Sequence, residues 1–142
     1  MLKGIPAIIS PELLKILSEM GHGDEIVLAD GNFPAASIAQ RLVRAEGIDV
    51  PTMLDAVLQL IPLDQYDDNH FVLMAKCEGD TADTSVWQEY ERIMHEYEPN
   101  SELSFTERFA FYDRAKKAYA VVACGEMRQY ANIILKKGCI IK

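Results

Sequence analysis

Hydrophobic residues along this chain follow two alternating spacings. In residues 11–20 they fall on one face of a helix, which Ser10 is placed to cap and Gly21 to end. Residues 26–29 are all apolar, as in a strand that is buried on both faces of a sheet. The same spacings predict further helices over about 35–46, 51–60, 84–98 and 107–117, and strands over 71–77, 103–105, 118–124 and 132–136.

The alternation of apolar strands with helices predicts an α/β protein. We expect a three-layer α/β/α sandwich, in which helices cover both faces of a largely parallel or mixed sheet. The chain has no internal repeat and no linker-like segment, so residues 1–142 are predicted to form a single domain. The polar segment 63–69 is expected to be an exposed loop. Strand order cannot be read from this pattern, but ligands of such sheets usually bind beyond the carboxyl ends of the strands.

Charge and cysteine content narrow the possible partners. Fourteen basic and 22 acidic residues give a formal net charge of −8, which argues against nucleic-acid and membrane partners because such a surface repels phosphate groups. No segment has the roughly 20 apolar residues that a membrane span needs, and the first residues do not resemble a secretory signal, so a cytoplasmic protein is expected. The three cysteines form no C-x-x-C pair and lie in apolar runs, which predicts free buried thiols and no metal site.

His22 and Asp30 are the first candidates for chemistry. His22 lies between two glycines, in the turn that joins the first helix to the first strand. Imidazoles exchange protons near neutral pH, so a histidine there can act as a general acid or base; the alternative is an exposed turn residue. Asp30 directly follows the strand 26–29, where its carboxylate can bind a ligand hydroxyl, orient a histidine or cap the turn before Pro34.

Tyr130, Asn132 and Arg108 are the remaining candidates. Tyr130 and Asn132 precede the last strand, and a phenol with an amide suits a neutral polyol ligand, although a tyrosine in this setting also suits a core or an interface. Arg108 begins a helix, where an arginine is usually a surface residue. The chain has no G-x-G-x-x-G, P-loop, G-x-S-x-G or H-E-x-x-H motif, and no cofactor is predicted. These residues alone indicate an α/β domain that binds a small polar molecule, with acid–base chemistry.

Three segments resemble the L-fucose mutarotase and D-ribose pyranase family, and the resemblance runs over nearly the whole chain. They are 17–34, with Gly-His and Asp-x-x-x-Pro; 108–115, with Arg-Phe-x-Phe-Tyr-acid-Arg-Ala; and 124–135, with Gly-Glu and Tyr-x-Asn. The resemblance implies an isomerase that exchanges sugar anomers without a cofactor. It implies that His22 is the proton donor and that the sugar is bound by Asp30, Arg108, Tyr130 and Asn132. It also implies ring-shaped homo-oligomers, typically decamers, with sites near the subunit contacts.

Within that family, Phe33 and the segment 108–115 favour the fucose branch over the ribose branch. Two positions depart from the pattern: Gly31-Asn32 stands where some relatives have Ala-His, and Asp113 stands where Glu is usual. The alternatives are a D-ribose pyranase, a mutarotase of another monosaccharide, or a sugar-binding protein without catalysis. A nucleotide-binding module would need a phosphate-binding loop, which the chain lacks.

Overall fold

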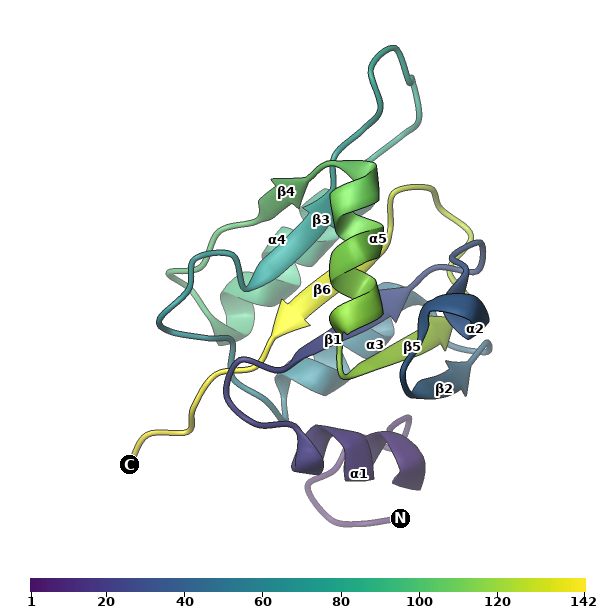
Figure 1. Ribbon diagram of the computed structural model, residues 1–142. Coiled ribbons are helices and arrows are strands. Elements are labelled where there is room, and N and C mark those ends of the chain that lie inside the picture. The colour runs from purple at the N-terminus through teal and green to yellow at the C-terminus, as the bar shows by residue number, and fades with distance from the viewer.

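Six strands form one mixed sheet at the centre of the computed structural model, which describes all residues 1–142 (Figure 1). The strands are β1 (Glu25–Ala29), β2 (Leu42–Ala45), β3 (Phe71–Met74), β4 (Ser104–Thr106), β5 (Ala120–Cys124) and β6 (Ile133–Lys136). Their order across the sheet is β2-β5-β1-β6-β3-β4. Only β6 runs against its two neighbours, β1 and β3, while the other pairs are parallel.

In this topology the strand ends line up along two opposite edges of the sheet. At one edge, which we call the carboxyl edge, the ends of β1 to β5 meet the start of β6. At the opposite edge, the amino edge, the starts of β1 to β5 meet the end of β6. Residues that follow β1, β3 and β4 therefore approach residues that precede β6, although they are far apart in sequence.

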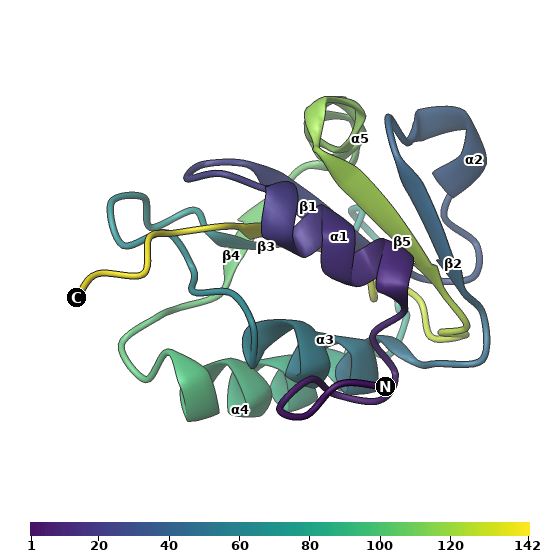
Figure 2. The same cartoon turned by 90° about the horizontal axis from the view of Figure 1, so that it is seen from below.

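Helices cover both faces of the sheet (Figure 2). The helices α1 (Pro11–Glu19), α3 (Val50–Leu58) and α4 (Val86–Tyr97) pack on one face, and α2 (Ala35–Ile38) and α5 (Arg108–Lys117) pack on the other. Successive residues of β1 point to opposite faces of the sheet. Ile26 and Leu28 pack in the hydrophobic cluster under α1, α3 and α4, and Val27 and Ala29 pack in the one under α2 and α5. The predicted three-layer α/β/α sandwich is confirmed, and of the two expected sheet types the structure has the mixed one. None of the helices is both long and apolar enough to cross a membrane.

Local capping fixes where the helices begin. The Ser10 hydroxyl accepts a hydrogen bond from the Leu13 amide at 3.1 Å, so the predicted cap of α1 is confirmed. At the start of α5, the Glu107 carboxylate accepts hydrogen bonds from the amides of Phe109 and Ala110, at 2.9 and 3.1 Å. These bonds satisfy amides that have no partner inside the helix. The cap of α5 also sets the position of Arg108, the first residue of that helix.

The predicted helix over 35–46 is wrong. The helix α2 ends at Ile38, and residues 42–45 form the edge strand β2, whose Leu42 and Val43 pair with β5. In this strand Val43 is buried and Arg44 is exposed, which is the alternation of an edge strand. Pairing with β5 satisfies the backbone of this segment, and this long-range interaction overrides the local helical spacing.

Two expectations about burial also need correction. The segment 63–69 is a loop, as predicted, but Leu63 and Asp64 within it are buried. All three cysteines are free, as predicted, but only Cys124 is buried, while Cys77 is exposed and Cys139 is half-buried. The polarity of neighbouring residues in the sequence therefore did not predict which of these side chains are buried.

The ends of β2 and β5 approach so closely that position 125 must be glycine. A Cβ built on Gly125 would lie 1.8 Å from the Glu46 carbonyl oxygen, whereas a Cβ on Gly47 would meet nothing within 4 Å. We therefore expect Gly125→Ala to lower the free energy of unfolding by about 3 kcal/mol, because the backbone must shift. The control, Gly47→Ala, is expected to change it by less than about 1 kcal/mol. Urea unfolding of both variants measures this, and equal midpoints would contradict the packing described here.

Candidate functional site

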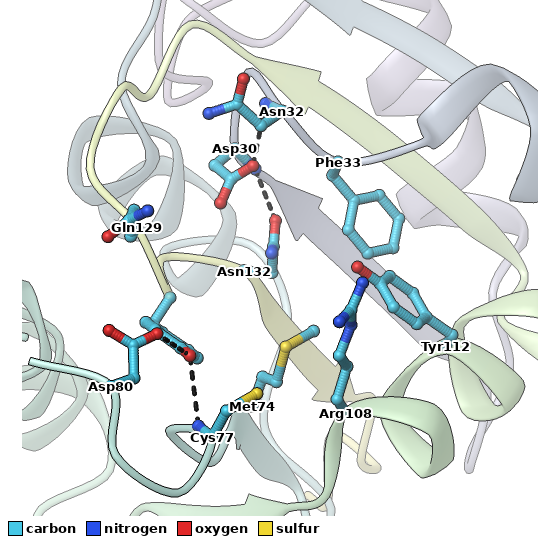
Figure 3. A pocket seen from close by; sticks show the side chains of 11 residues that line it. Asp30, Asn32, Phe33, Met74, Cys77, Asp80, Arg108, Tyr112, Gln129 and Asn132 are labelled. Carbon is cyan, nitrogen blue, oxygen red and sulfur yellow. Dashed lines mark hydrogen bonds between the residues drawn. The ribbon is translucent and has the colours of Figure 1, made fainter. Parts of the chain in front are cut away.

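A cavity of about 220 Å³ opens at the carboxyl edge of the sheet (Figure 3). Its walls come from the segments that follow β1, β3 and β4 and from the loop that precedes β6, which is where the topology brings distant segments together. The lining residues are Asp30, Asn32, Phe33, Met74, Cys77, Asp80, Arg108, Tyr112, Gln129, Tyr130 and Asn132. The site therefore lies where ligands of α/β sheets usually bind.

Asp30 and Asn132 form the base of the cavity and are both buried. The Asp30 amide donates a hydrogen bond to Asn132 Oδ1 at 2.7 Å, and Asp30 Oδ1 accepts one from the Asn32 amide at 3.0 Å. Because its oxygen is occupied, the amide nitrogen of Asn132 is left to donate to a ligand. Burial raises the pKa of the Asp30 carboxyl, and the nearby charge of Glu126 adds to this, although the Asn32 and Phe33 amides oppose it.

Tyr130 forms one side of the cavity and is held in an unusual backbone conformation. Its φ is 55°, in the left-handed region that residues other than glycine rarely adopt. Its hydroxyl donates a hydrogen bond to the Asp80 carboxylate and accepts one from the Cys77 amide at 3.1 Å. The bond to Asp80 raises the pKa of Tyr130 to about 12, so the phenol remains protonated at neutral pH.

The helix α4 holds the backbone around Tyr130 in place. Trp87 Nε1 donates to the carbonyl of Tyr130 at 2.8 Å, and the buried Tyr90 hydroxyl donates to the carbonyl of Ala131 at 2.7 Å. These two bonds act on consecutive residues of the loop. They fix the direction in which the Tyr130 side chain leaves the backbone, and so its place in the cavity.

The opposite side of the cavity combines aromatic surface with a cation. Phe33 and Tyr112 pack with their ring centroids 5.7 Å apart, and the Arg108 guanidinium lies 5.7 Å from the centroid of Tyr112. Figure 3 shows these three side chains facing Gln129 and Asp80 across the cavity. A cavity with carboxylates, an amide, a guanidinium and apolar rings fits a small neutral ligand that has several hydroxyl groups and one apolar end.

The structure brings together four of the five residues predicted from the sequence. Asp30, Arg108, Tyr130 and Asn132 line the cavity. His22 does not, because it lies before β1, at the amino edge. The five residues of β1 separate it from Asp30 by about 17 Å along the strand.

At the amino edge, His22 has a partner that the sequence did not indicate. Its Nε2 lies 2.9 Å from Oδ1 of Asp64, and its ring centroid lies 5.5 Å from that of Tyr66. The His22 side chain is 44% exposed, whereas that of Asp64 is 4% exposed. Asp30 lies at the other edge and cannot orient His22 of its own chain; the carboxylate that contacts His22 is that of Asp64.

Sequence reasoning also missed several residues of the cavity. Tyr112 lies four residues after Arg108 on the same helix, and this spacing could have placed both on one face. Asp80 and Met74 carry no such signal, because their place depends on where the chain turns after β3. No three His, Cys, Asp or Glu side chains are grouped so that they could hold a metal ion.

The raised pKa of Asp30 has a consequence for stability. A carboxyl whose pKa is higher in the folded state than in the unfolded state makes the protein less stable as pH rises through these two values. Asp30→Asn is therefore expected to raise the free energy of unfolding at pH 7, with a gain that shrinks as the pH falls through the raised pKa of Asp30 toward the usual value of a carboxyl. Urea unfolding at pH 7 and pH 4 measures both effects. A variant less stable than the wild type at pH 7 would contradict this expectation.

Known proteins resemble this chain over nearly its full length. A sequence profile of the RbsD / FucU transport protein family matches residues 3–140. Fucose mutarotase of Mus musculus is 52% identical over 145 residues, which cover 98% of this chain and 95% of the mouse protein. The crystal structure of FucU from Bifidobacterium longum superposes with a TM-score of 0.96 at 50% identity, covering 98% of this chain and all of that one. Fucose mutarotase from Streptococcus pneumoniae, solved in complex with L-fucose, has a TM-score of 0.92 and 48% identity, covering 99% of this chain and all of that one. The chain therefore belongs to the RbsD / FucU family.

Proposed function

We propose that this protein is an L-fucose mutarotase, an isomerase that interconverts the α and β anomers of L-fucose. The observation that carries the proposal is the full-length similarity to fucose mutarotases, one of which was solved with L-fucose bound. The cavity at the carboxyl edge supports it, because its polar and apolar walls suit one monosaccharide ring.

The reaction needs only proton transfers. A base takes the proton of the anomeric hydroxyl while an acid protonates the ring oxygen; the ring opens to the aldehyde, C1 rotates, and the ring closes on the other face. No cofactor takes part in these steps. Positioned side chains accelerate such transfers by about 10²–10⁴-fold. This modest acceleration is sufficient, because the uncatalysed reaction already proceeds in water.

The residues that line the cavity can share the binding of the sugar. We assign Asp30 and the amide nitrogen of Asn132 to sugar hydroxyls, since both groups face the cavity from its base. Tyr130 would orient the ring, and Arg108 would hold a sugar oxygen. Tyr130 is suited to this role because its hydroxyl and backbone are fixed before any ligand arrives.

The apolar side of the cavity supports fucose over ribose. L-fucose is a 6-deoxy sugar, so one end of the molecule is a methyl group. Phe33, Met74 and Tyr112 offer apolar surface to that methyl group, and D-ribose has no methyl to place there. A hydrophobic pocket discriminates by about 10-fold or more for a group of this size.

We further propose that a second copy of the chain completes the site. His22 is the proton donor in our assignment, yet it lies at the amino edge with an exposed side chain, away from the cavity of its own chain. In a head-to-tail contact, His22 of the partner subunit would enter the cavity beside Asp30. Such contacts close into rings, and the family resemblance implies a decamer.

We also propose that the enzyme acts in the cytoplasm on its monosaccharide, without nucleic-acid or membrane partners. Its three free cysteines suit a reducing compartment. Its formal net charge of −8 disfavours binding to anionic partners such as nucleic acids and membranes.

Exchange NMR of the anomeric protons tests the function. The wild type is expected to accelerate exchange of L-fucose about 10-fold or more over D-ribose. His22→Ala is expected to lose about 10²–10⁴-fold of the acceleration. His95→Ala is a matched control, because this histidine binds the Ser101 carbonyl at 2.9 Å, outside the cavity. Binding of fucose without faster exchange would favour the sugar-binding alternative, and a preference for D-ribose would favour the pyranase.

Complementation tests whether two copies share the site. His22→Ala and Asp30→Asn are each expected to be nearly inactive. When the two are co-expressed and assemble at random, roughly one site in four combines both intact residues, so about a quarter of the wild-type activity should return. Each variant expressed alone is the control. A mixture no more active than the separate variants would show that the site does not combine His22 of one copy with Asp30 of another.

A further inference from the structure

A histidine–carboxylate pair lies at the amino edge, outside the cavity of its own chain. It consists of His22, the buried Asp64 and the backbone groups that hold Asp64. His22 Nε2 faces Asp64 at 2.9 Å, while 44% of the histidine side chain is exposed. One ring nitrogen is therefore engaged with a buried carboxylate, and Nδ1 is the ring nitrogen left for a proton transfer.

We propose that Asp64 is a positioning residue for catalysis. It accepts a hydrogen bond from Nε2–H of His22, and this holds the neutral ring in the tautomer whose Nδ1 has a free lone pair. Nδ1 then gives and takes the proton, while the hydrogen on Nε2 stays there and remains hydrogen-bonded to the Asp64 carboxylate. The proposal rests on the assignment of His22 as the proton donor, and it adds the group that sets the orientation and tautomer of the ring.

The surroundings of Asp64 suit this role because they hold one carboxylate oxygen and both backbone groups. Its Oδ1 also accepts a hydrogen bond from the Tyr66 amide at 3.0 Å. Its carbonyl oxygen lies 2.6 Å from Nδ1 of His70, and its amide donates to the Lys136 carbonyl at 2.9 Å. A carboxylate held at its side chain and at both backbone groups gives the histidine a fixed direction.

The charge of Asp64 strengthens the preference for one tautomer. Burial alone would raise the pKa of this carboxyl, but the Tyr66 amide and His22 outweigh burial and lower it. Asp64 is therefore ionised at neutral pH. An ionised carboxylate has no proton to donate, so the ring nitrogen that faces it must carry the hydrogen.

The Tyr66 amide makes it possible to separate charge from geometry. This N–H donates to Oδ1 of Asp64, the same oxygen that faces His22. In Asp64→Asn, the amide oxygen must take that place, because the amide NH₂ group cannot accept the Tyr66 hydrogen. Asp64→Asn therefore keeps an acceptor in front of His22 without the charge, whereas Asp64→Ala removes both.

Nitrogen-15 NMR of the His22 ring tests the geometry without the reaction. At alkaline pH we expect hydrogen on Nε2 and none on Nδ1 in the wild type and in Asp64→Asn. In Asp64→Ala we expect a mixture of tautomers. Asp67→Ala is a matched control, because this nearby carboxylate pairs with Lys136 at 2.7 Å and should leave the tautomer unchanged. Hydrogen on Nδ1 in the wild type, or no change in Asp64→Ala, would overturn the proposal.

The kinetics of L-fucose exchange test its importance for catalysis. Asp64→Ala is expected to lower kcat about 10–100-fold with KM nearly unchanged, and Asp64→Asn less than about 10-fold. Adding Asp64→Ala to His22→Ala should cause no further loss, because a positioning residue acts only through the residue that it positions. An additive loss would indicate a purely structural role and overturn the proposal. If Asp64→Ala stays fully active while His22→Ala is inactive, the role of Asp64 fails and that of His22 stands; if His22→Ala stays fully active, the proposed function of His22 itself fails.

Discussion

The reversed direction of β6 between β1 and β3 organises both edges of the sheet. Because β6 starts where β1 ends, Asn132 meets Asp30, and a 2.7 Å hydrogen bond joins two residues that are 102 positions apart. Because β6 ends where β1 starts, the carbonyl of Lys136 accepts a hydrogen bond from the Asp64 amide, and the carbonyl of Lys137 accepts one from the Gly23 amide. The cavity at the carboxyl edge and the setting of His22 thus depend on the same antiparallel strand.

The helix α4 supports the cavity from behind through polar contacts with the loop before β6. Besides the bonds from Trp87 and Tyr90, its Glu89 pairs with Arg128, which in turn pairs with the buried Glu126 at 2.8 Å. The Arg128 guanidinium lowers the pKa of Glu126, which keeps a buried carboxylate ionised and paired. The Glu126 carbonyl then accepts the Gly31 amide at 2.7 Å, directly after Asp30. A continuous set of contacts therefore joins the helix to two sides of the cavity.

Local signals in the sequence predicted most of the fold. Apolar runs gave the buried strands, the Ser10 cap gave the start of α1, and the end of β1 marked Asp30 as a candidate. The edge strand β2 was missed because its half-exposed pattern resembles a short helix and only its pairing with β5 identifies it. The contact between His22 and Asp64 was missed for a related reason. The two residues are 42 positions apart, and they meet because β6 carries the loop 63–70 to the turn before β1.

The left-handed backbone of Tyr130 makes the cavity depend on a helix that lies outside the sheet. A glycine would adopt a φ of 55° without cost, whereas a tyrosine there costs of the order of 1 kcal/mol and persists only because its neighbours enforce it. The enforcing groups, Trp87 and Tyr90, belong to a helix rather than to the sheet. If α4 loosens on heating, the loop can relax and withdraw the phenol while the hydrogen bonds of the six strands remain. The cavity would then lose its shape at a temperature below that at which the sheet melts, so loss of ligand binding on heating and global unfolding would be separate events.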